Sequence, residues 1–335
     1  MATAVRDPGG LRILAADIGG TNARFAAFAA AGDGSLSLRG TCWLPTAGSA
    51  SFLELAARLD REGGLPLAGA AADVVAVAIA GPVEEGARSA PPNIAWDLDL
   101  ARDAAALGWR KWVLLNDFAA QAYACRTEVW ARAEEILPGR PDPAGAVAVV
   151  GAGTGLGKAA LLPDGQGGWV PLATEAGHGL FPFADGAELE FCRFVRGAAG
   201  RRQVIGDLVC SGSGLAYLHR FLTGEDKGPE EVAACFGPGS ATLEWFARFL
   251  GRACREFALQ TVCPGGLVVA GGIAARNPAV VRHPAFAAEF RDCETHAALL
   301  SRIPVRLSAD QDAGLWGAAL AGLLRVRAGT CFPAQ

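Results

Sequence analysis

Residues 11–29 read LRILAADIGGTNARFAAFA, and this stretch decides the fold. It begins with an apolar run that ends in the carboxylate of Asp17, passes through Gly19-Gly20-Thr21-Asn22, and returns to apolar residues at 23–29. Two strand-like runs around a glycine-containing turn are typical of a β-hairpin. The chain therefore opens with a predicted hairpin whose turn closely follows a carboxylate.

The same strand–turn–strand pattern returns about 130 residues later. Residues 146–150 lead into GAGTGLG at 151–157, and residues 159–162 are apolar again. Thr21 and Thr154 each lie inside their turn. A repeat of this length is that of a domain and is too long for a solenoid unit. We therefore expect a second half that is built like the first.

The remaining segments alternate between helices and strands. Ser51 and Glu54 have the spacing of a capping box, and apolar residues recur at helical period up to residue 60. Apolar runs predict buried strands at residues 74–80, 112–115 and 267–270. A second segment with helical period predicts a further helix at residues 215–222. The most polar stretch, residues 225–231, is expected to be a surface loop. Strands separated by helices predict an α/β fold.

Composition limits the class of protein further. A length of 335 residues suggests two domains or one large barrel, and 51% hydrophobic with 19% charged residues indicates a globular protein. The net charge of −4 argues against a nucleic-acid binder. Apolar runs stay far below the ~20 residues of a membrane span, and the first ten residues lack a signal-peptide core. The nine cysteines lack the close pairs of metal sites, so we expect reduced thiols in a cytoplasmic protein.

Three glycine-rich turns, each after a predicted strand, are the candidates for binding phosphate. They are residues 19–21, 151–157 and 271–272. Glycines let backbone N–H groups approach phosphate oxygens closely, so three such turns favour a nucleotide. Leu156 stands where a dinucleotide fingerprint needs glycine, and Ala152 and Ala159 stand where a Walker A loop needs glycine and Ser or Thr. These departures disfavour dehydrogenases and P-loop NTPases.

Asp17 and Asp117 each end a predicted strand beside a loop. Carboxylates at the carboxyl ends of strands face the ligand crevice in α/β sheets. Beside phosphate-binding turns, one such group suits Mg²⁺ and the other suits a hydroxyl proton, as phosphoryl transfer requires. Asp117 is equally well interpreted as the N-cap of a helix that begins FAAQAYA.

Five motifs, taken in order, make the chain similar to the bacterial glucokinases, the ATP-dependent glucose 6-kinase branch of the superfamily that includes hexokinase and actin. They are DIGGTNAR at 17–24, NDF at 116–118, GAGTGLG at 151–157, Glu175-x-x-His178 and AGGI at 270–273. The resemblance, which extends from about residue 11 to about residue 325, implies two ribonuclease-H-like (actin-like ATPase) α/β domains with a cleft between them. Residues 1–127 plus 312–335 would form the smaller domain and 128–311 the larger. It further implies ATP-dependent phosphorylation of D-glucose at the 6-hydroxyl, the first step of glycolysis, with Mg²⁺ and a homodimeric enzyme.

The resemblance also implies roles for individual residues. Asp17 resembles the carboxylate that organises Mg²⁺, and Asp117 resembles the general base that takes the proton of the 6-hydroxyl. Further sugar-binding groups correspond to Asn93, Asn116, Glu175, His178 and Asp207. The two phosphate hairpins correspond to turns that contain Gly19, Gly20, Thr21, Asn22, Gly151, Gly153, Thr154 and Gly155. Gly271 and Gly272 correspond to the adenosine loop.

Asp207 marks a departure, because the family usually has a glutamate four residues ahead of the serine that is Ser211 here. A shorter carboxylate reaches the sugar through a moved loop or through a water. Ala176 likewise replaces a glycine in a Glu-Gly-Gly-His pattern. A kinase for another hexose (mannose, fructose or an amino sugar) and a sugar-responsive regulator stay open as alternatives. About ten residues precede the first strand, too few for the helix-turn-helix extension of such regulators.

Overall fold

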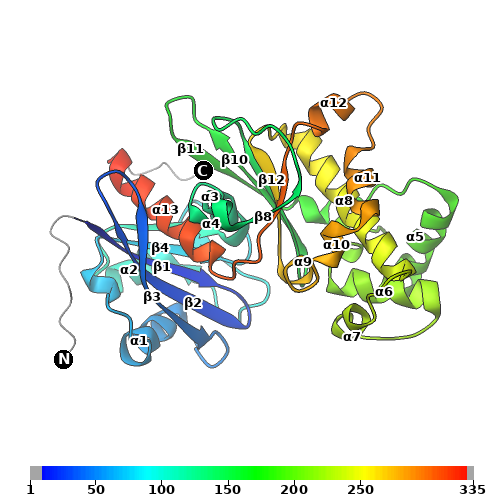
Figure 1. Ribbon diagram of the computed structural model, residues 1–335. Coiled ribbons are helices and arrows are strands. Elements are labelled where there is room, and N and C mark those ends of the chain that lie inside the picture. Colours follow the sequence, from blue (N-terminus) through cyan, green and yellow to red (C-terminus); the bar gives the residue numbers. More distant parts are fainter. Residues whose placement is uncertain (1–9, 330–335) are drawn as a thin grey trace. The chain divides into compact units, whose positions relative to one another are not determined.

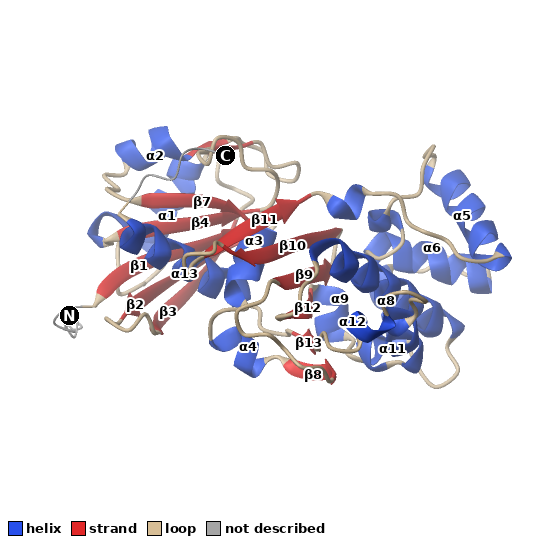
Figure 2. Cartoon of the chain, turned by 90° about the horizontal axis from the view of Figure 1, so that it is seen from above, coloured by secondary structure: helices blue, strands red, loops and turns tan. Residues whose placement is uncertain are grey.

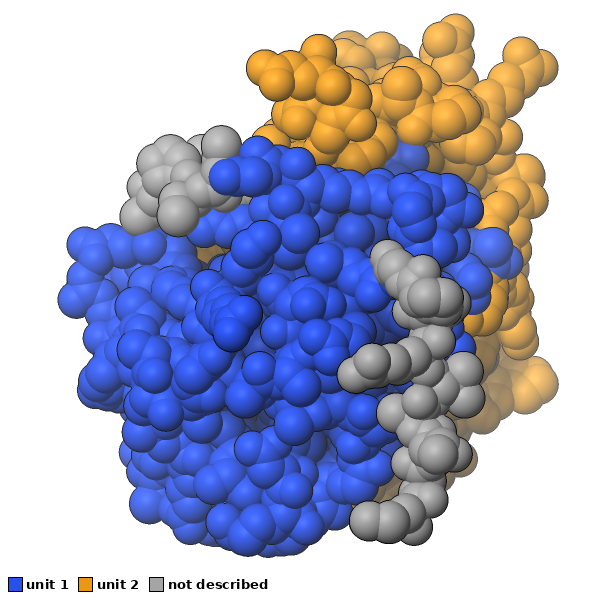
Figure 3. All heavy atoms as spheres, turned by 90° about the vertical axis from the view of Figure 1, so that its left-hand side faces the viewer, with its two compact units in different colours: residues 1–131, 311–335 blue, residues 132–310 orange. Residues whose placement is uncertain are grey.

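The computed structural model describes residues 10–329, and the chain divides into two compact units. Unit 1 is Met1–Ala131 with Gln311–Gln335, and unit 2 is Arg132–Asp310; Figure 3 colours them blue and orange. The chain thus begins in unit 1, forms the whole of unit 2, and returns to complete unit 1.

A five-stranded sheet in the order β3-β2-β1-β4-β7 is the framework of unit 1. Its strands are β1 (Leu11–Ile18), β2 (Asn22–Ala30), β3 (Leu36–Pro45), β4 (Val74–Ile79) and β7 (Trp112–Asn116). β1 and β2 pair antiparallel, with Asp17 opposite Arg24, which confirms the predicted hairpin. β4 and β7 continue the sheet in parallel, and every residue of β4 is buried, as its apolar run predicts.

Helices cover both faces of this sheet, and the alternation of side chains along β1 decides which residue meets which helix. The helices are α1 (Phe52–Glu62), α2 (Leu100–Ala106), α3 (Asp117–Ala124), α4 (Glu128–Arg132) and α13 (Ala313–Ala328), with short pieces η1 (Gly69–Ala71), β5 (Arg88–Ser89) and β6 (Leu98–Asp99). Leu14 and Ile18 share a buried cluster with α1. Ile13 faces α13, where a Cβ at Gly322 would lie 3.4 Å from its side chain; Figure 1 shows α13 in red across the blue strands. Asp17 lies four residues after Ile13 and therefore faces α13 as well.

The sheet of unit 2 repeats this plan. Its order is β11-β10-β9-β12-β13-β8, with strands β8 (Glu134–Leu137), β9 (Val147–Ala152), β10 (Leu156–Pro163), β11 (Trp169–Thr174), β12 (Gly266–Ala270) and β13 (Val305–Leu307). β9 pairs antiparallel with β10 and parallel with β12, as β1 does with β2 and β4. β8 is an additional antiparallel edge strand. The predicted second half built like the first is confirmed, and Figure 2 shows the strands of both sheets in red.

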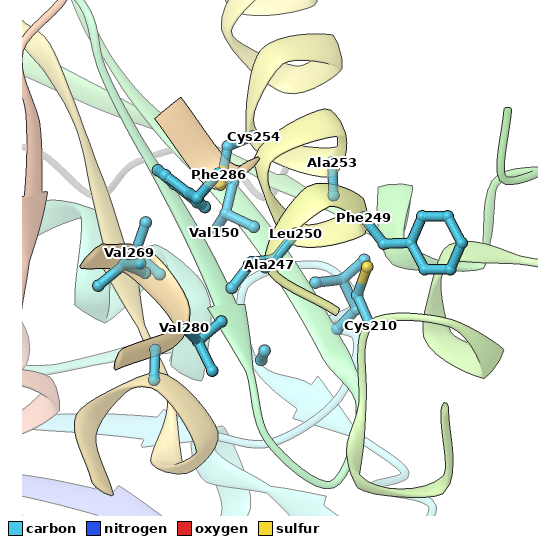
Figure 4. Packing of buried hydrophobic residues seen from close by; sticks show 14 of the residues in the cluster. Val150, Cys210, Ala247, Phe249, Leu250, Ala253, Cys254, Val269, Val280 and Phe286 are labelled. Atoms are coloured by element: carbon cyan, nitrogen blue, oxygen red, sulfur yellow. The ribbon is translucent and has the colours of Figure 1, made fainter. Parts of the chain in front are cut away.

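The core of unit 2 lies where α8 packs against the sheet. The helices are α5 (Gly186–Ala199), α6 (Gly212–Thr223), α7 (Pro229–Ala234), α8 (Ala241–Thr261), α9 (Gly272–Arg276), α10 (Ala279–Arg282), α11 (Pro284–Arg291) and α12 (Ala297–Leu300), with 3-10 helices η2 (Ala176–His178) and η3 (Gly206–Leu208). Figure 4 shows Ala247, Leu250 and Cys254 of α8 in a cluster with Val150 of β9, and all four are buried. This packing fixes the strand ends from which the glycine turns of unit 2 emerge.

A buried ion-pair network ties three helices of unit 2 together. Arg252 of α8 is 3% exposed; its Nε donates to Glu289 of α11 over 2.7 Å and its Nη2 donates to Glu188 of α5 over 3.0 Å. Each buried charge has an opposite partner, without which it would be costly. Within residues 10–329, no helix is both long enough and apolar enough to cross a membrane.

The prediction of a surface loop over residues 225–231 is wrong for residues 229–231, because they belong to α7 (Pro229–Ala234). Pro229 is the first helical residue, and Glu231 accepts the backbone N–H of Gly228 over 2.8 Å, so a glycine and a proline start a helix here. The helix expected at 215–222 is confirmed but begins at Gly212, because Ser211 is its N-cap. In both segments the non-apolar residues mark the start of a helix: Gly228 and Pro229 at α7, and Ser211 at α6.

Candidate functional site

The turn between β1 and β2 is held by its own backbone and by Thr46, the residue that follows β3. The N–H of Gly19 donates to the carbonyl of Asn22 over 3.0 Å, which closes the turn. The hydroxyl of Thr46 donates to the carbonyl of Gly19 over 2.7 Å, and the N–H of Thr46 donates to that of Thr21 over 3.0 Å. Thr46 is 2% exposed, so these bonds are shielded from water.

Gly20 brings this turn against Asn93, a second predicted site residue. A Cβ at Gly20 would lie 2.7 Å from the backbone carbonyl of Asn93, so only glycine allows the approach. The side chain of Asn93 is exposed, as are Thr21 and Asn22. The first phosphate hairpin and one proposed sugar-binding group thus lie side by side in unit 1.

Asp17 lies beside this turn in a group of charges. Its Oδ2 is 3.6 Å from Nη1 of Arg24, and that nitrogen also donates to the carbonyl of Gln311 over 2.6 Å. The guanidinium of Arg24 lies 4.4 Å from the ring centroid of Trp43. Burial raises the pKa of the Asp17 carboxyl above its usual value; Arg24 opposes this shift and Asp312 adds to it. Arg24 therefore offsets the charge of a carboxylate that lies in a poorly solvated position.

Asp312 is a residue of this group that the sequence reasoning missed. It directly precedes α13, and a Cβ at Gly314 in the first turn of that helix would lie 2.6 Å from Oδ2 of Asp17. The available signal was an aspartate just before a long apolar segment, the usual position of a helix cap. Nothing in its spacing links it to Asp17, because the two are almost the whole chain apart.

Asn116 and Asp117 stand where β7 ends and α3 begins. Asn116, not Asp117, is the N-cap: its Oδ1 accepts the N–H groups of Phe118 over 2.9 Å and of Ala119 over 3.2 Å. The N-cap alternative for Asp117 is therefore wrong. Asp117 is the first residue of α3, is half-buried, and accepts the N–H of Phe118 over 2.9 Å through Oδ1. The first turn of α3 therefore presents the carboxylate of Asp117 directly after the end of β7.

The side chain of Asn116 is largely committed to holding the protein together. Its Nδ2 donates to the carbonyl of Gly81 over 2.9 Å, while Oδ1 carries the two capping bonds. An amide has two N–H hydrogens and two acceptor positions, so one Nδ2 hydrogen is left for a ligand. Asn116 thus fixes the start of α3, and with it Asp117.

The corresponding turn of unit 2 lies between β9 and β10. Gly153 donates its N–H to the carbonyl of Gly155 over 2.8 Å, and the N–H of Gly212 at the start of α6 donates to the carbonyl of Gly153 over 2.9 Å. Thr154 is exposed at the tip. Asp207 approaches the same turn, since its Oδ1 accepts the N–H of Leu156 over 2.6 Å. One oxygen of this predicted sugar-binding carboxylate therefore bonds the phosphate hairpin.

Glu175 and His178 lie together on the segment that follows β11. Nδ1 of His178 is 3.5 Å from Oε2 of Glu175, and the N–H of His178 donates to the backbone carbonyl of Glu175 over 2.9 Å. The side chain of His178 is 63% exposed and that of Glu175 is 61% exposed, so both can reach a polar ligand. Gly177 between them packs so tightly that a Cβ would overlap the carbonyl oxygen of Leu156, at 1.7 Å.

Gly272 meets the hairpin turn of unit 2 at a cavity of about 600 Å³, and the preceding Gly271 packs against Ala152 of β9. Gly271 has φ of +88°, and a Cβ there would lie 2.4 Å from the carbonyl of Ala152, so glycine is required on both counts. The cavity is lined by Gly153, Thr154, Gly212, Leu215, Pro229, Glu230, Ala233, Ala234, Gly272, Ile273, Arg276 and Asn277. Apolar side chains beside glycine backbone suit a flat ring with a phosphate tail. The wall from α7 was missed by sequence reasoning, because that helix was expected to be partly loop.

Comparison with known proteins agrees with this arrangement. A family model described as Glucokinase matches residues 14–324. The chain belongs to the glucokinase family. The glucokinase of Brucella suis biovar 1 (strain 1330) is 33% identical over 319 residues, which cover 91% of this chain and 89% of that protein. The glucokinase of Chromobacterium violaceum is 35% identical over 309 residues, which cover 88% and 84%.

A solved structure of this family has the same fold. The glucokinase from an Antarctic psychrotroph superposes with a TM-score of 0.82 at 27% sequence identity, over 93% of this chain and 99% of that one. The predicted fold class, two α/β halves of the ribonuclease-H-like kind, is confirmed. Glucokinase family membership also accounts for the repeated glycine turns, one in each half.

Proposed function

We propose that this protein transfers the terminal phosphate of ATP to the 6-hydroxyl of D-glucose, with Asp117 as the general base. The observation that carries the proposal is the end of β7, where Asn116 caps α3 and leaves Asp117 half-buried in its first turn. A kinase needs a carboxylate to accept the proton of the attacking hydroxyl. Membership of the glucokinase family supplies the sugar and the reaction.

Four groups are proposed to hold the sugar. Glu175 and His178 are exposed and adjacent, and Asn93 is exposed beside Gly20. Asn116 contributes its remaining Nδ2 hydrogen. Carboxylate, imidazole and amide groups together provide both donors and acceptors, which a sugar hydroxyl needs because it is itself both.

ATP is proposed to bind with its phosphates at the two glycine turns and its adenosine in the cavity of unit 2. Gly153 and Thr154 belong to both the turn and the cavity wall, so a nucleotide there would run from the cavity to the turn. The backbone N–H groups of such a turn are suitable donors to phosphate oxygens. Gly272 lines the same cavity, which supports the role predicted for the AGGI motif.

Mg²⁺ is proposed to bind at Asp17 together with the nucleotide. Mg²⁺ in kinases is held by one or two carboxylates, substrate phosphates and waters. Asp17 fits this requirement, because it is a carboxylate beside the first glycine turn and a second carboxylate, Asp312, is among its electrostatic neighbours. Within residues 10–329 no group of three or more metal-binding side chains occurs, so the ion is expected to arrive with ATP. When bound, Mg²⁺ would neutralise charge on the phosphate oxygens.

We further propose a homodimer in the cytoplasm. The dimer rests on the family resemblance, and light scattering of the purified protein tests it through the particle mass. The cytoplasm is supported by the cysteines, since all eight of those within residues 10–329 are free thiols. Free thiols persist in reducing compartments.

The proposed function is tested by measuring ADP release from Mg·ATP with a panel of sugars. We expect kcat/KM to be highest for glucose, with mannose, fructose and glucosamine lower. A higher value for one of the other hexoses would assign the protein to that sugar. No sugar-dependent ADP release, together with glucose binding, would favour the regulator.

A further inference from the structure

Leu156 is the point where three segments of unit 2 meet. Its N–H donates to Oδ1 of Asp207 over 2.6 Å, and its carbonyl lies against the backbone of Gly177. Its side chain is 4% exposed, and a Cβ at Gly206 would lie 3.0 Å from it. The first residue of β10 is therefore in contact with both η3 and η2.

The two 3-10 helices are themselves bonded to each other's flanks. The N–H of Gly206 donates to the carbonyl of Gly179 over 2.9 Å, and the N–H of Phe181 donates to that of Val204 over 3.1 Å. An isolated β-bridge pairs Leu180 with Ile205. The segment that carries Glu175 and His178 is thus a continuous backbone neighbour of the segment that carries Asp207.

The length of Asp207 suits this position. A Cβ built at Gly155 would lie 2.6 Å from its Oδ1, so the carboxylate lies directly against the turn. A glutamate would carry its carboxylate about one C–C bond further, into the backbone of that turn, unless the segment moved. An aspartate reaches the N–H of Leu156 without such a movement, and its charge strengthens the bond.

We infer that Asp207 is a positioning residue for the nucleotide: it fixes the turn at 153–155 and couples that turn to the segment that binds the sugar. This inference rests on the proposed function. If Leu156 is held only when η2 and η3 are in place, ordering of Glu175 and His178 by glucose also orders the turn that receives phosphate. Coupling of this kind is reciprocal, so each ligand tightens the other by the same factor.

The test measures, by calorimetry on the full chain, the affinities for AMP-PNP with Mg²⁺ and for glucose, each alone and in the presence of the other. Asp207→Ala removes the acceptor, whereas Asp207→Asn keeps an oxygen for the N–H of Leu156. We expect Asp207→Ala to weaken AMP-PNP binding about tenfold or more, because the turn loses the hydrogen bond from the N–H of Leu156 to a charged group. We expect Asp207→Asn to stay within about threefold of the parent, and Asp207→Glu to resemble Asp207→Ala, because only aspartate-length side chains fit.

Glucose binding separates this inference from a direct sugar contact. In the absence of nucleotide, all three variants should bind glucose within about threefold of the parent. In Asp207→Ala, the factor by which each ligand raises the affinity for the other should fall towards one. Weaker glucose binding in Asp207→Asn with AMP-PNP binding unchanged would overturn the inference and make Asp207 a sugar ligand. Unchanged affinities in every variant would overturn it as well.

Asp164 offers a matched control, because its Oδ1 also accepts backbone N–H groups in a turn of unit 2, from Gly168 over 2.7 Å and from Gln166 over 2.8 Å. Asp164→Ala should leave both affinities unchanged. Hydrogen exchange at the amide of Leu156 gives a readout that needs no ligand, and it should be faster in Asp207→Ala and Asp207→Glu but not in Asp207→Asn or Asp164→Ala. Failure of the proposed function would appear differently, as a parent protein that binds no AMP-PNP and releases no ADP with any sugar, while this exchange difference persists. An equal exchange rate in parent and Asp207→Ala would contradict the inference.

Discussion

The turns at the ends of β1 and β9 occupy the same place in two sheets of the same order, yet they are built and supported differently. In unit 1 the position before the turn is Asp17, paired with Arg24 across the hairpin. In unit 2 the equivalent pair is Gly151 and Gly157, with no charge. The first turn therefore carries a carboxylate within its own hairpin, whereas the carboxylate beside the second turn, Asp207, comes from another segment.

The supports differ as well. Thr46, which holds the first turn, directly follows the strand next to β2, so this support is part of the sheet. Asp207, which holds the second turn, comes from a segment between β11 and α8, outside the sheet. Gly212 from the start of α6 adds a second external bond. The first turn is thus fixed by its own framework, and the second depends on neighbouring segments that also carry sugar-binding groups.

This contrast separates the tasks of a kinase. The turn of unit 2 presents glycine backbone at the cavity wall, and Oδ1 of the neighbouring Asp207 already accepts the N–H of Leu156, so this turn suits the nucleotide. A carboxylate is a ligand that Mg²⁺ prefers, so the turn of unit 1 suits this ion. The carboxylate of Asp117 lies in the same unit. Changes in unit 1 should therefore affect turnover most, and changes at the turn of unit 2 should affect ATP binding most.

The largest effect is expected for Asp117→Asn in unit 1. An amide can bond the 6-hydroxyl but cannot accept its proton, so kcat should fall by about 10²–10⁴. Glucose affinity, measured by calorimetry, should stay within a few-fold of the parent. A variant that keeps kcat within a few-fold would show that Asp117 is not the base.

The next largest effect is expected for Gly153→Val in unit 2. The nearest atoms to a Cβ at Gly153 are 3.9 Å away, so the protein itself has room for a side chain. The valine should keep phosphate away from the backbone, and losing one such bond to a charged group weakens ATP binding about 10–100-fold. Glucose binding without nucleotide should not change, and equal loss of both ligands would contradict the assignment of this turn.

The α/β class was predictable from strands that alternate with helices, and the pattern shared by residues 11–29 and 151–157 predicted a second half built like the first. The ribonuclease-H-like fold followed only from the resemblance of the five motifs to the glucokinases. The N-cap alternative for Asp117 was wrong, since Asn116 and Asp117 are both good caps and only the backbone path decides. The bond between Asp207 and Leu156 was not predictable, because its donor is a backbone N–H, which every residue except proline has. Asp312 was missed because its contact with Asp17 joins the two ends of the chain.

A smaller effect is expected for Thr46→Val, which removes the donor to the carbonyl of Gly19. The half-buried carbonyl loses this partner, so the free energy of unfolding in urea should fall by about 1 kcal/mol. Thr46→Ser keeps the hydroxyl and is the control. The KM for ATP should rise less than in Asp207→Ala, because the backbone bonds of the first turn persist; a larger rise would remove the contrast between the two supports.

The smallest effect is expected for the stability of Asp17→Asn. Burial raises the pKa of Asp17 in the folded protein, so its ionised form lowers stability at neutral pH, and this penalty disappears as the pH falls below the pKa of the unfolded chain. The variant should therefore unfold at a slightly higher temperature than the parent at pH 7, and the two should converge on acidification. A variant less stable than the parent at pH 7 would mean that the ion pair with Arg24 outweighs burial.

The claim that the turns of both units serve one reaction is tested most directly by following the phosphorus atom. Phosphorus NMR of the purified protein with Mg·ATP and glucose reports where the terminal phosphate goes. We expect glucose 6-phosphate and ADP in equal amounts, with no inorganic phosphate. Inorganic phosphate in place of the sugar phosphate, or ATP left intact in the presence of glucose, would contradict it.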